Sequence, residues 1–162
     1  MEHKCIIAVL GATGYIGGRL VPTLLERNWS VRAVGRNLEK LRCRPFATHP
    51  GIELTQADAL DRTALTTALR GCHAVYYLVH SMYPGVGNFE DRDKRAAEIM
   101  RDAAADAGLQ RIIYLGGLGD DAPDLSLHLK SRMEVGRILG SGPAALTWLR
   151  AAMILGSGSA SF

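Results

Sequence analysis

The sequence predicts one α/β domain built on a doubly wound parallel sheet with helices on both faces. Apolar runs of strand length alternate with longer amphipathic helical patterns along the whole chain, which favours parallel strands joined by helices. A glycine-rich segment, GATGYIGG, follows the first expected strand and opens the first expected helix. The length of 162 residues suits a single domain with its own hydrophobic core.

The first strand is expected at CIIAVL, residues 5–10, because a continuous apolar run is typical of a strand buried on both faces. Cys5 belongs to this run and is expected to be a small core residue. A helix should follow over residues 15–28, with leucines at helical spacing and Pro22 as its one awkward residue. The second strand is expected at SVRAV, residues 30–34.

The middle of the chain continues this alternation. IELTQ, residues 52–56, predicts the third strand, and Asp61 can cap a helix over residues 62–70 that Gly71 ends. AVYYLV, residues 74–79, predicts the fourth strand.

The remaining elements follow in the same order. They are a turn-rich loop at 82–88, a helix at 89–107 closed by Gly108, a strand at 111–116, a loop at 117–124, a helix at 126–139 and a sixth strand within 145–156. We therefore expect one domain over residues 1–156, a flexible tail over 157–162 and no C-terminal substrate-binding lobe.

Composition excludes several classes of function. The 19 basic and 16 acidic residues are scattered and leave a net charge of +3, so nucleic-acid binding is not expected. Nothing in the sequence reaches the length of a membrane span or a signal peptide, so the expected location is the cytoplasm and no membrane partner is expected. Three separated cysteines and five histidines show no disulfide or metal spacing, so no metal site is predicted.

The glycine-rich segment has the physical features of a phosphate loop. Gly11 allows a tight turn away from the strand, Gly14 lets backbone approach a pyrophosphate, and Gly17 lets the helix pack against the sheet. The N-terminus of the following helix then presents unpaired N–H groups and a partial positive charge to an anion. The alternative is a glycine turn without a ligand.

The glycine spacing, GxxGxxG, resembles the short-chain dehydrogenase/reductase superfamily, especially its extended and atypical branches. Within the atypical branch the chain is most similar to bacterial NmrA-like NAD(P)H-binding proteins. The phrases YYLVHSM (76–82), RIIYLGGLG (111–119) and HLKSRMEVG (128–136) support this similarity. The resemblance implies a Rossmann fold with strand order 3-2-1-4-5-6 and a dinucleotide cofactor.

The end of the second strand favours NADP(H) over NAD(H). A domain that prefers NAD usually has Asp or Glu there to hold the ribose 2′-hydroxyl, whereas this chain has Val34, Gly35 and Arg36. Arg36 can form a fork on a 2′-phosphate, and Arg32, two residues earlier, is expected to point to the same side. The alternative for Arg36 is a solvated loop cation.

Further cofactor contacts follow from the resemblance. Asp58 would accept a hydrogen bond from the adenine amino group with Ala59 beside the ring, while Asp61 is interpreted as a helix cap. Val79 and His80 match positions where backbone lines the cofactor, although His80 equally suits a plain polar residue at a strand end. With Arg132, discussed next, the predicted cofactor-binding set is Gly11, Thr13, Gly14, Tyr15, Ile16, Gly17, Arg36, Asp58, Ala59, Val79, His80 and Arg132.

The catalytic positions of the superfamily are all changed in this chain. The resemblance places a Ser after strand five, where Gly116 and Gly117 stand, and a Tyr-x-x-x-Lys pair on the next helix, where His128 and Arg132 stand. Three interpretations remain open: an ordinary helix face, ribose binding by Arg132, or proton transfer by His128. None of the tyrosines elsewhere in the chain has a Lys four residues later, so no Tyr-x-x-x-Lys pair replaces the missing one.

The sequence therefore leaves three hypotheses. The first is an NAD(P)H-binding module or redox sensor with degenerate catalytic residues. The second is an NADPH-dependent oxidoreductase that reduces a flavin, a quinone or a similar acceptor without a Tyr acid. The third, least favoured, is a sugar-nucleotide epimerase-like enzyme. The small-molecule substrate and the oligomeric state are not predicted.

Overall fold

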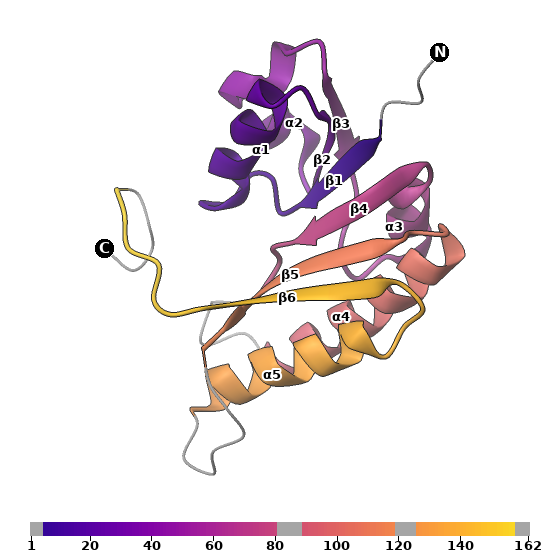
Figure 1. Cartoon of the computed structure of the whole chain (residues 1–162), viewed down its shortest axis with the longest axis vertical. Helices are drawn as coiled ribbons and strands as arrows, with labels where there is room; N and C mark the ends of the chain where they lie inside the picture. Colours follow the sequence, from indigo (N-terminus) through magenta and orange to yellow (C-terminus); the bar gives the residue numbers. More distant parts are fainter. Residues whose placement is uncertain (1–4, 81–88, 119–125, 158–162) are drawn as a thin grey trace.

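The computed structural model describes residues 5–80, 89–118 and 126–157. It contains a six-stranded sheet in the order β3-β2-β1-β4-β5-β6, and every neighbouring pair of strands is parallel. The strands lie side by side between two helical layers (Figure 1). The predicted Rossmann fold and its strand order are confirmed.

The elements follow the predicted alternation closely. The strands are β1 (Ile6–Leu10), β2 (Ser30–Gly35), β3 (Ile52–Gln56), β4 (Cys72–Tyr77), β5 (Arg111–Gly117) and β6 (Ala145–Ala151). The helices are α1 (Gly17–Glu26), α2 (Leu38–Arg42), the 3-10 helix η1 (Pro45–Thr48), α3 (Arg62–Leu69), α4 (Phe89–Asp106) and α5 (Leu127–Gly140).

The two faces of the sheet bury separate sets of apolar side chains. In β1, Ile7 and Val9 pack toward α1, α2 and η1, whereas Ala8 and Leu10 pack toward α3, α4 and α5. Successive residues of a strand point to opposite faces, so a strand covered on both sides needs apolar residues throughout. This explains why β1 is a continuous apolar run. The strand order reverses between β1 and β4.

Local signals for helix ends are confirmed. The Asp61 side chain accepts a hydrogen bond from the Ala64 N–H at 2.9 Å and caps α3. Gly71 and Gly108 follow α3 and α4 with φ angles of 75° and 67°, in the left-handed region that favours glycine. Pro22 lies inside α1, and the helix continues through it.

β4 covers Cys72–Tyr77, two residues earlier than the predicted strand 74–79. Two further features differ from the sequence predictions. Cys5 is exposed, because β1 begins only at Ile6 and Cys5 precedes the sheet, so its assignment to the core was wrong. The short helices α2 and η1 were not predicted. The Asn37 side chain caps α2 by accepting a hydrogen bond from the Lys40 N–H at 2.9 Å, and the helix buries Leu41.

Several predicted segments lie outside the described residues: the loop 82–88, residues 119–124 of the second predicted loop, and 158–162 of the predicted tail. Within the described ranges, no helix is long and apolar enough to cross a membrane.

Candidate functional site

The glycine-rich turn between β1 and α1 is fixed to the neighbouring strand. Gly11 has a φ angle of 94°, a left-handed conformation that a side chain would strain. The N–H groups of Gly11 and Ala12 both reach the Val34 carbonyl oxygen near the end of β2, at 3.1 and 3.4 Å. The Gly14 N–H then donates to the Gly11 carbonyl oxygen at 2.9 Å, which closes the turn.

Gly17 and Gly14 are needed for different reasons. A Cβ atom on the buried Gly17 would lie 2.8 Å from the Ala12 Cα, so only glycine lets the helix start against the turn. A Cβ atom on Gly14 would meet only the Gly11 carbonyl oxygen, at 3.2 Å. Gly14 is exposed, so its lack of a side chain leaves the outer surface of the turn open to a ligand.

The N-terminus of α1 is open to an anion. Ile16 occupies the N-cap position without a side-chain cap, and the first turn carries no acidic residue. Among the described residues, the N–H groups of Tyr15, Ile16 and Gly17 have no backbone acceptor. Unpaired amides and the helix dipole favour a phosphate at this position, so the turn fits the pyrophosphate of a dinucleotide.

Two arginines belong to the connection between β2 and β3. Arg36 follows β2 directly and is exposed, and its carbonyl oxygen accepts a hydrogen bond from Gln56 Nε2 at 3.1 Å. Arg44 donates a guanidinium hydrogen bond to the carbonyl oxygen of Thr13 inside the glycine turn. Its Nη2 atom would lie 3.3 Å from a Cβ atom on Gly18. Sequence reasoning missed Arg44.

The Arg32 side chain is bound to other groups of the protein. Its guanidinium forms an ion pair with Glu53 at 2.8 Å and donates to the carbonyl oxygens of Ala68 and Arg70, both at 2.8 Å. These groups lie at the C-terminal end of α3 and beside β3, so Arg32 is engaged in joining α3 to the sheet. Its guanidinium is therefore already engaged, and the expectation that Arg32 points to the same side as Arg36 stays a prediction.

The predicted adenine contacts lie directly after β3. Asp58 Oδ1 accepts a hydrogen bond from the Leu60 N–H at 2.9 Å, which shapes the turn before α3. Ala59 is buried in this turn. The carboxylate has a second oxygen, so its predicted contact with an adenine amino group remains compatible with this geometry and stays a prediction.

The position expected to carry a catalytic serine is filled by an aromatic ring. A Cβ atom on Gly116 would overlap the indole nitrogen of Trp148 and lie 3.1 Å from the Tyr114 ring. A Cβ atom on the next residue, Gly117, would lie 2.8 Å from a methyl group of Leu129. Packing between β5, β6 and α5 therefore leaves no room for a side-chain hydroxyl at Gly116, and at Gly117 the Leu129 side chain would have to move.

Arg132 is turned toward the sheet. Its Nη2 donates to the Leu115 carbonyl oxygen at 2.8 Å, and its own carbonyl oxygen accepts the Tyr114 hydroxyl at 3.1 Å. Its Nε is buried with no partner among the described residues. These contacts tie α5 to the carboxyl end of β5, which is a structural role, so Arg132 does not simply lie on a solvated helix face. Ribose binding by Arg132 stays a prediction.

Three basic side chains gather at the ends of β4 and α5. His80 keeps much of its surface exposed, but partial desolvation lowers its pKa, and the positive charges of Arg132 and then His128 lower it further, while Asp93 and a hydrogen bond with the Leu78 backbone oppose these effects. Burial raises the pKa of Tyr114 to about 12, despite the nearby Arg132. His80 is thus held toward its neutral form beside two basic residues, one of which, His128, takes the place of the superfamily's Tyr.

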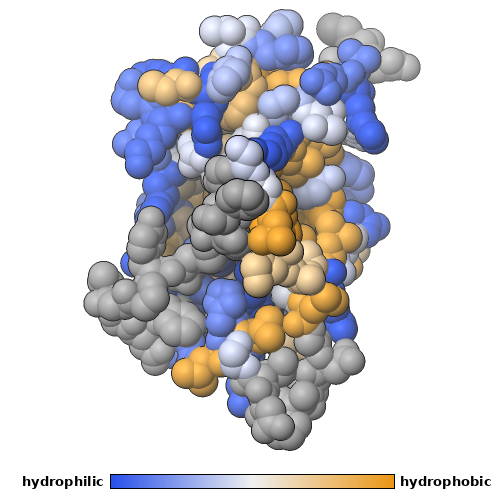
Figure 2. Space-filling view, turned by 90° about the vertical axis from the view of Figure 1, so that its left-hand side faces the viewer, coloured by the Kyte–Doolittle hydropathy of each residue, from blue (hydrophilic) through white to orange (hydrophobic). Residues whose placement is uncertain are grey.

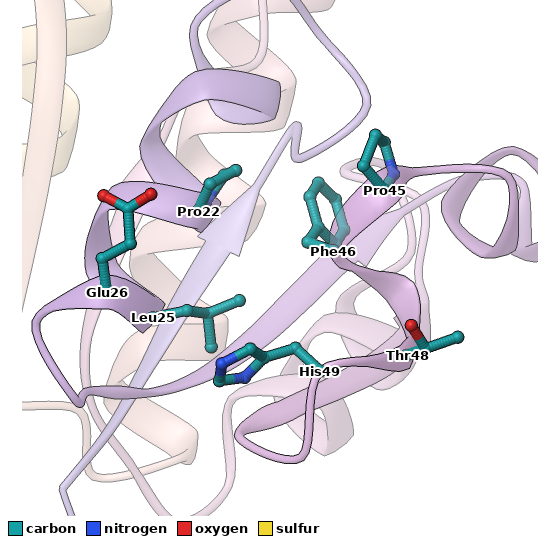
Figure 3. Close-up of a pocket in the computed structure, with 7 residues that line it drawn as sticks. All are labelled: Pro22, Leu25, Glu26, Pro45, Phe46, Thr48 and His49. Atoms are coloured by element: carbon teal, nitrogen blue, oxygen red, sulfur yellow. The ribbon is translucent and has the colours of Figure 1, made fainter.

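A separate hollow of about 310 Å³ lies on the flank of the domain, between α1 and η1. Figure 3 shows its lining residues: Pro22, Leu25, Glu26, Pro45, Phe46, Thr48 and His49. It borders the C-terminal half of α1, away from the free amides of the glycine turn, so it is not the dinucleotide site. Within the described part of the chain, no three potential ligand side chains gather to hold a metal ion.

The comparisons with known proteins agree with this geometry. The sequence family described as NAD(P)H-binding matches residues 11–154. Cinnamoyl-CoA reductase 1 of Oryza sativa is 32% identical over 124 residues, which are 72% of this chain and 36% of that protein.

Solved structures extend the similarity. The NADPH-dependent quinone oxidoreductase of Escherichia coli, solved with NADPH, is 29% identical with a TM-score of 0.73 and matches 89% of this chain and 48% of that one. The triphenylmethane reductase of Citrobacter sp. shows the same fold, with a TM-score of 0.78 at 23% identity, over 91% of this chain and 49% of that one. The chain spans half or less of the length of these proteins.

The environment of His80 predicts an acid-sensitive stability. The folded state favours the neutral ring, whereas the unfolded chain takes up a proton near the ordinary pKa of 6.5. Stability that is fully present above this value is therefore lost as pH falls toward the lower folded pKa. We expect His80→Gln to lose less unfolding free energy than the parent between about pH 7.5 and about pH 5.5. Denaturant titrations at both pH values measure this, and equal losses in the two proteins would contradict it.

Proposed function

The chain belongs to the NAD(P)H-binding family, and we propose that it prefers NADP(H) and serves a reduction whose acceptor needs no proton from a tyrosine. Residues 1–156 form the dinucleotide-binding domain in this proposal, and the cytoplasm is its location. The observation that carries the proposal is the open N-terminus of α1, where the N–H groups of Tyr15, Ile16 and Gly17 have no backbone acceptor among the described residues and Gly14 leaves the turn without a side chain at its exposed surface.

The charges near the glycine turn support the choice of NADP(H). The end of β2 has no carboxylate to accept a ribose 2′-hydroxyl, and the exposed Arg36 stands there instead. Arg44 adds a second guanidinium at the glycine turn, held by the Thr13 carbonyl oxygen. Two arginines on one connection provide the planar donors that suit a phosphate.

The proposed class of hydride acceptor follows from the missing serine and tyrosine at the expected catalytic positions. Gly116 and Gly117 offer no hydroxyl, and the helix position of the superfamily's Tyr carries His128. Bound NADPH supplies a hydride, and quinones and flavins accept hydride without a phenol as acid. The quinone oxidoreductase from Escherichia coli, at 29% identity, supports this acceptor class.

A second candidate is a dinucleotide-binding module or redox sensor without turnover. The observation that favours it is Arg132, whose guanidinium holds the Leu115 carbonyl oxygen and lies beneath the end of β5. In this candidate the chain's residues bind and orient NADPH, and the response is conformational. Turnover assays distinguish the two candidates.

The first test concerns the choice of cofactor. We expect NADPH to bind more tightly than NADH, and Arg36→Ala to remove most of the difference. The loss should be about 1–3 kcal/mol, or roughly 5- to 150-fold in Kd, for a charge-assisted contact with phosphate. Calorimetric or fluorescence titration of both cofactors measures the preference.

Arg42→Ala is the matched control, because Arg42 lies on the same connection but is paired with Glu39 at the surface of α2. It should leave the preference unchanged. Equal affinity of the parent protein for NADPH and NADH would refute the assignment of Arg36 to the 2′-phosphate.

The second test is a screen of acceptors with NADPH. We expect quinones or flavins to be reduced and simple ketones to react slowly, because general acid–base help is worth about 10²–10⁴-fold. Loss of NADPH absorbance measures each rate. Rapid ketone reduction that His128→Phe abolishes would instead make His128 a working replacement for Tyr, and NADPH binding with no turnover would favour the module.

A further inference from the structure

The segment that follows β6, residues 152–157, returns from the edge of the sheet to its centre. We call it the return segment. Its start is fixed by the sheet, since Ala151 pairs with Gly117 and the Ala151 carbonyl oxygen accepts the Leu118 N–H at 2.9 Å. β6 is an edge strand, whereas α1, which the segment reaches, follows the central strand β1.

The far end of the return segment is fixed by Arg19 in the first turns of α1. Arg19 Nη2 donates to the Ser157 carbonyl oxygen at 2.7 Å, and its Nη1 donates to the Tyr15 carbonyl oxygen at 3.3 Å. The guanidinium lies 3.9 Å from the centre of the Tyr15 ring, a cation–π contact.

Gly156 fits closely against the same ring. A Cβ atom on Gly156 would overlap the Tyr15 hydroxyl, so a larger residue here would displace either the Tyr15 side chain or the segment. Arg19, Tyr15 and Gly156 together join the return segment to the helix that begins at the glycine turn.

From the end of β6 the return segment runs outward beyond the carboxyl edge of the sheet and then rises to the level of α1 (Figure 1). Its two ends lie at β6 and at α1, so it spans the carboxyl edge beyond β5 and β4, which lie between them in the sheet order. A dinucleotide binds across the carboxyl edge of such a sheet, with its pyrophosphate at the first helix. The adenosine half then lies over β2 and β3, so the nicotinamide half lies on the side of β4 and β5. The return segment therefore runs along the nicotinamide side of the site.

The return segment brings exposed apolar side chains to this edge. Met153 is 72% exposed and Leu155 is 63% exposed, and the exposed Leu118, Leu127 and Leu149 also lie at the carboxyl ends of β5 and β6 or the start of α5. Figure 2, which looks onto this side of the molecule, shows apolar surface in the middle of the face, bordered by hydrophilic side chains. Exposed apolar side chains grouped at one edge of the sheet suit an apolar ligand.

We propose that Arg19 is a positioning residue that holds the return segment across the nicotinamide side of the site. The segment walls in the nicotinamide ring, and its apolar side chains give an apolar, planar hydride acceptor a surface to lie against. This inference rests on the dinucleotide binding proposed above. Arg19 acts through the segment, and the adenosine half of the cofactor does not depend on it.

The test compares two ligands in Arg19→Ala. NADPH occupies both halves of the site, whereas adenosine 2′,5′-bisphosphate occupies only the adenosine half. We expect NADPH to dissociate about five- to tenfold faster from the variant, the size of effect expected for losing one hydrogen bond within the protein, and the bisphosphate to bind unchanged. The emission of bound nicotinamide, measured at saturation, should fall because water reaches the ring.

Two further variants make the test specific. Arg27→Ala is the matched control, because Arg27 is an exposed arginine at the other end of α1. This variant should change neither the dissociation of NADPH nor the binding of the bisphosphate. Gly156→Val displaces the return segment while keeping Arg19, and it should reproduce the faster NADPH dissociation.

Three outcomes would overturn the proposal. Equal weakening of both ligands would mean that Arg19 supports the glycine turn itself, and tighter NADPH binding would mean that the return segment obstructs the site. Unchanged dissociation and emission would mean that the segment does not reach the nicotinamide. If the parent protein bound neither ligand, the proposed dinucleotide function would fail instead, which is a separate result.

Discussion

The tight passage from β1 into α1 is the constraint on which the rest of the site depends. Gly11 must adopt a left-handed φ of 94°, and Gly17 must start the helix where a Cβ atom would lie 2.8 Å from the Ala12 Cα. These two requirements place the open end of α1 at the carboxyl edge of the sheet. The strand order reverses beside β1, and dinucleotides bind at this edge in sheets of this topology. The arginines and the return segment are arranged around that point.

The other half of the site is shaped by packing. Trp148 fills the space beside Gly116 and also lies against α5, where a Cβ atom on Gly136 would come within 2.5 Å of its ring. A serine at residue 116 would have to displace this ring from between β6 and α5. The Arg132 guanidinium likewise donates a hydrogen bond to the Leu115 carbonyl oxygen near the end of β5. In our account the chain's own residues therefore bind and orient the dinucleotide, and the reactivity of the acceptor decides whether reduction occurs.

Much of the fold could be predicted because it depends on local patterns. Apolar runs, the glycine spacing and the Asp61 cap each act within a few residues, and the missing acid after β2 could be seen directly. Contacts between distant segments could not be predicted in this way. The hydrogen bond from Arg44 to the Thr13 carbonyl oxygen joins residues 31 apart in the sequence, and that from Arg19 to the Ser157 carbonyl oxygen joins residues 138 apart. Arg32 shows the same limit, because the carbonyl oxygens that engage its guanidinium belong to Ala68 and Arg70, 36 and 38 residues farther along the chain.

The central claim is that the glycine turn and the open end of α1 hold the phosphates of a dinucleotide. The most direct measurement is calorimetric titration of NADPH into the parent protein and into Gly14→Val. Gly14 is exposed and its Cβ position meets only one backbone oxygen, at 3.2 Å, so the variant should keep its fold, as its circular dichroism and thermal unfolding would show. The account predicts that the parent binds NADPH and that the folded variant does not, because the valine side chain stands where the pyrophosphate approaches. Equal affinity in the two folded proteins would contradict it.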